Sequence, residues 1–273
     1  MRLNLSNIVV LLLIFVSCED VIDLKLPPMK QDVYVVSGLI TNELDFVTVS
    51  VTQISKHTGV NVPVSHAIVF IESESMGNGE GVMQRIDFVE DSLNPGMYVS
   101  DRRVRAVINR NYTLNVHIDT MHITASAYME PITNVLPVSY YKVASEEGIF
   151  ALSDEQWSEE QAMWKFSLNW DFNHTCDTCK AQMFAYSLQS VDVAQLLSTK
   201  KQKVVFPLST QIIREKYSLT KEHAEYVRGL LLETQWNGGY FDEQPANVPS
   251  NFSHGVLGYW GACMVLRDTS VVQ

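Results

Sequence analysis

The sequence has little positive charge, and neither glycine nor proline is abundant. Lysine and arginine number 20 against 31 aspartates and glutamates, so the 273 residues carry a formal net charge of −11. Because basic contacts to phosphates supply most nucleic-acid affinity, this balance argues against a nucleic-acid partner. Thirteen glycines and nine prolines exclude a collagen-like or low-complexity chain. The 46% hydrophobic content predicts one or two folded domains.

Linear catalytic motifs are also missing. The patterns Gly-x-Ser-x-Gly and His-Glu-x-x-His do not occur, so the commonest hydrolase signatures are absent. The stretch 77–81 is rich in glycine but lacks the Lys-Ser/Thr pair of a phosphate-binding loop, which predicts a hairpin loop instead. His117 and His122 flank a turn without an evident third ligand, so we expect exposed, polar-face histidines. We therefore expect neither an enzyme nor a cofactor.

No hydrophobic run is long enough to cross a membrane. The longest, Ile8–Val16, spans roughly 13 Å as a helix, against a bilayer core of about 30 Å. With Arg2 before it and small residues after it, the run predicts a signal peptide over residues 1–17. Cys18 follows directly and resembles the lipobox cysteine of bacterial lipoproteins, which is diacylated. The alternative is a plain signal peptide with a chance cysteine.

The residues after Cys18 predict a tether over residues 18–30. Glu19 and Asp20 resemble the acidic surface-export signals of Bacteroidota lipoproteins, and a prolyl pair further on stiffens the segment. A solvated acidic tether without an export role is the alternative. We expect a lipid-anchored protein of the outer membrane, displayed on the cell surface, with the periplasmic leaflet as the alternative location.

Residues 31–130 have the alternation of a β-domain. In Phe46–Ile54 and Tyr112–Ile118, apolar and polar residues alternate, which is typical of half-buried strands. Val33–Ile40 and Ala67–Ile71 are denser apolar runs of strand length. About seven short strands at this spacing predict an antiparallel β-sandwich of transthyretin or immunoglobulin type.

A connector and a second β-rich domain follow. Residues 131–160 form the predicted connector, in which the acid-rich Ser145–Glu160 indicates a loop. Residues 161–273 form the predicted C-terminal domain. Its clearest strand is Trp164–Phe172, whose aromatic and aliphatic residues all fall on one face. Further strands are expected at Gln182–Leu188, Lys203–Leu208 and Val256–Leu266.

One long helix is predicted over residues 220–236. Thr220 can cap it, and the Asn-Gly-Gly sequence after Trp236 can end it. A stripe of residues at helical spacing is expected to face the core: Ala224, Val227, Leu230, Leu231 and Thr234.

The remaining cysteines suggest a small cross-link. Cys176 and Cys179 are three residues apart with His174 nearby, and we expect a local disulfide. A metal site using all three, or a redox pair, is the weaker alternative, because closed zinc sites need four ligands. Cys263 is expected to be a buried apolar thiol, although spacing also allows it to pair with Cys176 or Cys179.

The loop after the predicted helix is a candidate contact surface. Trp236, Tyr240 and Phe241 place three aromatic rings on a glycine-hinged segment, where they could bind a ligand or a protein partner. The alternative is that these rings fold back and cap the C-terminal core.

Several segments resemble one family along most of the chain. They are 18–24 (CEDVIDL), 36–42 (VSGLITN), 95–98 (PGMY), 111–114 (NYTL), 241–248 (FDEQPANV) and 258–260 (GYW). They are similar to a Bacteroidota lipoprotein family known as a domain of unknown function (family 4249). This resemblance implies an envelope lipoprotein encoded near TonB-dependent receptors, and it carries over no catalytic residue.

Three functions are compatible with these features, and the least favoured is an enzyme or metalloprotein that uses His174, Cys176 and Cys179. The favoured one is an outer-membrane lipoprotein, a surface-exposed accessory or binding component associated with TonB-dependent nutrient uptake. The membrane would be contacted through the lipid anchor, and a TonB-dependent receptor is the expected partner. The alternative is a structural or adhesive envelope protein that binds a protein partner and no small molecule.

Overall fold

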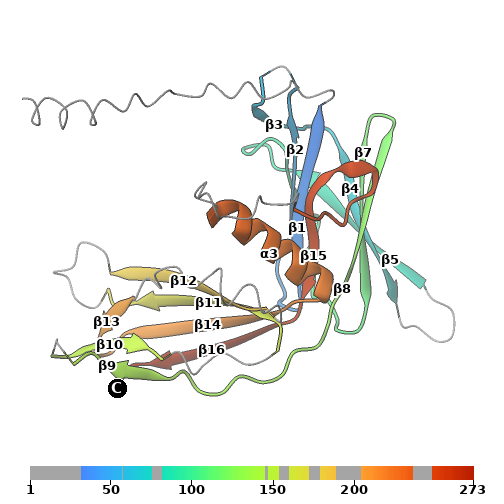
Figure 1. Cartoon of the computed structure of the whole chain (residues 1–273). Helices are drawn as coiled ribbons and strands as arrows, with labels where there is room; N and C mark the ends of the chain where they lie inside the picture. The colour runs from blue at the N-terminus through green and yellow to red at the C-terminus, as the bar shows by residue number, and fades with distance from the viewer. Residues whose placement is uncertain are drawn as a thin grey trace, which may run out of the picture.

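The computed structural model describes eight stretches of the chain (Figure 1). They are residues 32–56, 58–75, 82–144, 147–153, 160–171, 179–188, 204–235 and 248–273. Within them, strands form three sheets of nine, three and four strands, accompanied by one α-helix. The prediction of a mainly β protein with one long helix is confirmed.

The largest sheet is built mostly from the first half of the chain. Its strands are β1 Val33–Thr41, β2 Thr48–Ile54, β3 Asn61–Pro63, β4 Ile68–Ser75, β5 Val82–Glu90, β6 Met97–Ser100, β7 Asn111–Ile118, β8 Met121–Tyr128 and β15 Leu257–Cys263. Their order is β15–β1–β2–β6–β5–β4–β7–β8, with β3 paired to β2. Neighbours are antiparallel except β1 and β15, which run parallel.

Alternation along these strands decides which side chains enter the core. Val49 and Val51 on β2 are fully buried, whereas Ser50 between them is only partly buried. Leu114 on β7 belongs to the same apolar cluster as these valines. Because β2 and β7 lie in opposite halves of the strand order, the sheet bends around one shared core.

The two ends of the large sheet meet at this core. Trp260 on β15 is fully buried, and its Nε1 donates to the Tyr112 carbonyl at 2.9 Å. The Thr124 amide of β8 donates to the Ser253 hydroxyl at 2.9 Å, next to the short 3₁₀ helix η2, Ser253–Gly255. A segment near the C-terminus therefore completes a sheet that begins at the first described residues.

Parallel pairing of β15 with β1 depends on a glycine. Gly258 lies opposite Val36 with a φ of +97°, in the region that favours glycine. A Cβ atom there would stand 2.0 Å from the Val36 carbonyl oxygen. Only a residue without a side chain fits this approach of the two strands.

The chain changes sheets directly after β15. The sequence predicts one strand over Val256–Leu266, but the structure has two, β15 and β16 Val265–Val271, in different sheets. Asn42 fixes the crossing, since its side chain accepts from the Val265 amide at 2.6 Å and donates to the Val265 carbonyl at 3.2 Å. This link spans 223 residues, so local alternation could not reveal the break.

The four-stranded sheet contains the clearest predicted strand. Its members are β11 Ala162–Asn169, β12 Lys180–Ser187, β14 Gln211–Ser218 and β16, in the antiparallel order β12–β11–β14–β16. Trp164, Phe166 and Leu168 of β11 are each at most 2% exposed, as their spacing predicts. They form the second core with the partly buried residues of the neighbouring strands.

A small sheet covers part of this second core. It consists of β9 Tyr140–Lys142, β10 Ile149–Leu152 and β13 Val205–Pro207, in the order β13–β10–β9. The Tyr140 ring meets the Phe150 ring edge-on at 5.7 Å. The prediction of a loop over Ser145–Glu160 is therefore wrong at β10. A strand of four residues is too short for its alternation to be recognised in the sequence.

Helix α3, Lys221–Gln235, lies between the large and four-stranded sheets (Figure 1). The Thr220 hydroxyl accepts from the His223 amide at 3.2 Å, as expected of the cap. Ala224 and Val227 are buried, but Leu230 is 44% exposed and Thr234 is exposed, so the predicted stripe is correct only in the first half. None of the described helices has the length and apolar character needed to span a membrane.

Candidate functional site

The outer face of the four-stranded sheet, opposite the second core, carries a hollow of about 450 Å³. Strand register arranges six of its lining side chains in two rows, Lys180–Asn169–Gln211 and Gln182–Ser167–Ile213. We call this site the polar hollow. Alternation places these residues outside, because Leu168 between Ser167 and Asn169 points into the core.

The lining of the polar hollow is hydrogen-bonding but nearly uncharged. It offers amide and hydroxyl groups, with Lys180 as the single charged side chain among the described lining residues. The Lys180 Nζ lies 4.0 Å from the Asp171 carboxylate, and both side chains are largely exposed. Asn169 Oδ1 accepts from the Asp171 amide at 3.2 Å, which orients the Asn169 side chain.

A row of charged side chains borders the polar hollow. Glu215 pairs with Lys165 at 2.9 Å and with Arg267 at 2.5 Å, and Arg267 also reaches Glu43 at 3.1 Å. Burial lowers the pKa of Arg267, but the two carboxylates raise it by more. These four charged side chains therefore form ion pairs with one another. Phe184 lies opposite Lys165 at the edge of the same row and is 49% exposed.

Beyond this row, helix α3 covers the outer face. Met163 and Tyr217 pack with Ala224 of the helix and with Leu219. Burial, with the nearby carboxylates Glu215 and Glu43, raises the pKa of Tyr217 to about 12. The face thus passes from an apolar, helix-covered end to an open, polar end, and the polar hollow lies at the open end.

The opposite face of β14 contains two buried cations. Arg214 donates to Asp268 at 3.0 Å and to the Leu136 carbonyl. Lys216 lies 2.6 Å from a Glu160 oxygen and 5.1 Å from the centre of the Trp164 ring. Both cations bind segments that cross the second core, so we assign them a structural role.

The environment of Glu160 shows how Lys216 is compensated. Burial raises the pKa of Glu160, but hydrogen bonds from Lys216 and Thr133, together with attraction to Lys216, lower it below its usual range. Lys216 also donates to the Thr133 carbonyl at 3.2 Å. Glu160 is therefore a carboxylate at neutral pH, and its bonds to Lys216 and Thr133 hold both ends of the connector against the sheet.

A histidine and a cysteine meet where α3 contacts β15. The Nδ1 of His223 lies 3.7 Å from the Cys263 sulfur, and its ring stacks on Tyr259 at 4.6 Å. Burial raises the pKa of Cys263 to about 12 and lowers that of His223 to about 4. Because a nucleophilic cysteine must be a thiolate, this neutral pair is unsuited to catalysis.

The sequence allows Cys263 to be either a buried free thiol or a disulfide partner. The cysteine is a fully buried free thiol, as expected. The alternative that it pairs with Cys176 or Cys179 is therefore wrong. Cys179 directly precedes β12, and its carbonyl accepts from the Trp170 amide at 2.8 Å. The strands before and after the Cys-x-x-Cys motif pair antiparallel, and Cys176 lies outside the described residues.

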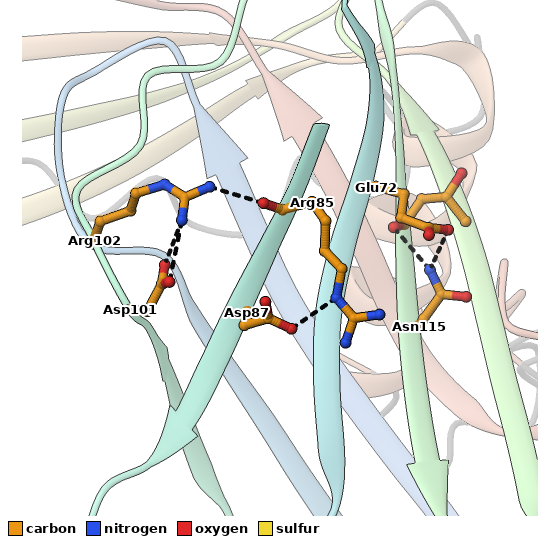
Figure 2. A network of polar contacts seen from close by, with 7 residues as sticks. Glu72, Arg85, Asp87, Asp101, Arg102 and Asn115 are labelled. Carbon is orange, nitrogen blue, oxygen red and sulfur yellow. Dashed lines mark hydrogen bonds and ion pairs between the residues drawn. The ribbon is translucent and has the colours of Figure 1, made fainter. Parts of the chain in front are cut away.

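The two predicted surface histidines stack on each other. The rings of His117 and His122 are 4.0 Å apart and nearly parallel. His122 Nε2 donates to Asn115 Oδ1 at 3.0 Å. The Asn115 amide donates to Glu72 at 3.3 Å, as Figure 2 shows. Burial, followed by the charges of His122 and Arg85, lowers the pKa of His117. Over the described ranges, no group of three or more metal-ligating side chains occurs.

Two ion pairs lie near these histidines, one on β5 and one directly after β6. Figure 2 shows Arg85 bonded to Asp87 at 2.8 Å and Arg102 paired with Asp101 at 3.1 Å. Arg102 also donates to the Arg85 carbonyl at 2.8 Å. These charged groups therefore pair with one another.

Most residues proposed from sequence lie outside the described residues. They are Cys18, Glu19, Asp20, His174, Cys176, Trp236, Tyr240 and Phe241. The polar hollow was missed, because its residues come from three strands and form no local motif. The available signal was the polar face of β11, on which Ser167 and Asn169 alternate with apolar residues.

The fold and the polar hollow define a mainly β protein with an open, nearly uncharged candidate binding site. Residues 19–269 match the family described as Domain of unknown function (DUF4249), so the chain belongs to that family. No curated protein and no solved structure matches the chain. The resemblance inferred from the sequence segments is thereby confirmed at the level of the family.

Proposed function

We propose that this chain is an outer-membrane lipoprotein of Bacteroidota, a surface-exposed binding component associated with TonB-dependent nutrient uptake. The sequence at Arg2, Ile8–Val16 and Cys18 supports a signal peptide followed by a lipid anchor. Two acyl chains would give stable anchoring where one gives only reversible binding. From Cys18 to the first strand at Val33, the chain is long enough to act as a tether.

The polar hollow is the observation that carries the binding role. Helix α3 and the charged row around Glu215 occupy the rest of the outer face. The open end retains amide and hydroxyl groups from three adjacent strands, including Gln182, Asn169 and Gln211. Such groups converging at one concavity are typical of a small-ligand site.

The finer architecture forms part of the same proposal. The bent large sheet is proposed to be a sandwich of transthyretin or immunoglobulin type, which supports the binding domain. A Cys176–Cys179 bridge is proposed to close the β11–β12 connection at one end of the polar hollow. Cys263 is free and buried elsewhere, which leaves these two cysteines as partners for each other.

Deletion and complementation test the proposed role. Cells lacking the gene should lose uptake of one nutrient, and the wild-type gene should restore it. Cys18→Ala should restore less uptake than the wild-type gene, because the protein is no longer anchored. The double variant Gln182→Ala/Gln211→Ala should restore no uptake, although this protein is anchored. Normal uptake of every nutrient by the deletion strain, with a protein partner retained in detergent, would contradict the proposal and favour a structural role.

A further inference from the structure

We propose that the polar hollow binds a neutral oligosaccharide; this inference rests on the proposed binding function and names its ligand class. No carboxylate is among the described lining residues, so a cation finds no counter-charge there. Lys180, the only cation among these described residues, is exposed and lies 4.0 Å from Asp171, so an anion finds no buried positive partner. An uncharged ligand fits both observations.

The lining combines apolar and hydrogen-bonding groups. Leu168, Ala181 and Ile213 contribute apolar surface, among amides, a hydroxyl and an ammonium. Side-chain amides donate and accept hydrogen bonds, as sugar hydroxyls do. Asn169, Gln182 and Gln211 can therefore each bond to a sugar hydroxyl, either as donor or as acceptor. A ligand without such groups would leave these amides unpaired on binding.

An aromatic ring supplies the second element of sugar recognition. Phe184 follows Gln182 by two residues on β12, so both side chains leave the same face. Phe184 is 49% exposed, although it lies beside the row of charged side chains around Glu215. The flat ring can cover the apolar face of a pyranose, while the amides bond to its hydroxyls.

The row spacing suits a chain of sugar units rather than a single one. Neighbouring strands lie about 4.8 Å apart, and alternate residues on one face about 6.6 Å apart. Lys180 to Gln211 spans three strands, and Phe184 to Lys180 spans four residues along β12. Hydrogen-bonding groups are therefore distributed over an area wider than one ring.

A glycan array followed by titration calorimetry tests this assignment. The protein, with Cys18→Ala for solubility, is screened against neutral and charged oligosaccharides together with a library of neutral peptides. We expect neutral oligosaccharides to bind. Gln182→Ala/Gln211→Ala should weaken binding about tenfold or more, and Phe184→Ala should also weaken it.

Matched controls lie away from the four-stranded sheet. Gln84 is an exposed glutamine of β5, and Phe46, which precedes β2, is 48% exposed, close to the value for Phe184. Gln84→Ala and Phe46→Ala should leave glycan binding unchanged. Circular dichroism melting of all variants shows whether each one is folded.

The possible outcomes separate this inference from the proposed function. Absence of binding to every neutral oligosaccharide, or binding that the hollow variants do not weaken, overturns the inference. Peptide binding through Gln182 and Gln211 overturns it too, but leaves the proposed uptake role intact. Glycan binding by a protein whose deletion leaves uptake normal supports the inference and contradicts the uptake role.

Discussion

His223 should make the stability of this protein dependent on pH below neutrality. Burial lowers its pKa from 6.5 to about 4 in the folded protein, whereas the unfolded chain titrates near 6.5. Between these values the unfolded state binds more protons, so acidification favours unfolding. The contribution of neutral His223 is complete above pH 6.5, falls as the pH drops, and is fully lost below about pH 4.

The size of the effect follows from linkage. Over the full window, a difference of 2.5 pKa units corresponds to about 3 kcal/mol, and the part between pH 7 and pH 5 is about 2 kcal/mol. His223→Phe removes the titration but keeps an aromatic ring against Tyr259, which the histidine stacks on at 4.6 Å.

Urea unfolding of both proteins at pH 7 and pH 5 measures this difference. The free energy of unfolding of the wild type should fall by about 2 kcal/mol more than that of His223→Phe. His254→Asn is the control, because His254 is exposed and its φ of 58° suits asparagine; it should respond to pH as the wild type does. Equal pH responses in the wild type and His223→Phe would refute the reasoning.

Three further changes test the packing. Glu160→Gln should cost about 3 kcal/mol in urea unfolding because it leaves Lys216 buried and uncompensated, and adding Lys216→Met should recover most of that loss. Gly258→Ala should lower the melting temperature far more than Gly59→Ala, since only the first new Cβ meets backbone; equal effects would contradict the β1–β15 geometry. Iodoacetamide should label Cys263 only after denaturation, and mass spectrometry showing native labelling would contradict its burial.

Strands with strict alternation could be predicted from sequence. In β11, every second residue from Ala162 to Leu168 is apolar, and each is buried. The helix was predictable at its start, where Thr220 caps it. The exposure of its second half was not predictable. Leu230 has the spacing of a core-facing residue, but it lies beyond the part of the sheet against which the helix packs and is exposed.

Strand β14 escaped prediction because charge obscures its alternation. Arg214 and Lys216 occupy core-facing positions that normally hold apolar residues. Their burial is possible because Asp268 and Glu160, which are distant in sequence, lie beside them in the fold. The polar hollow depends on the same long-range register, so neither feature has a local signature.

Surface proteolysis of intact cells, combined with mass spectrometry of the N-terminal peptide, tests lipid anchoring and surface display together. We predict that the mature protein begins at a diacylated Cys18 and that protease removes the folded part of the chain from whole cells. A diacylated protein that resists the protease until the cells are lysed would contradict surface display. An unmodified Cys18 in the mature protein would contradict the lipid anchor itself.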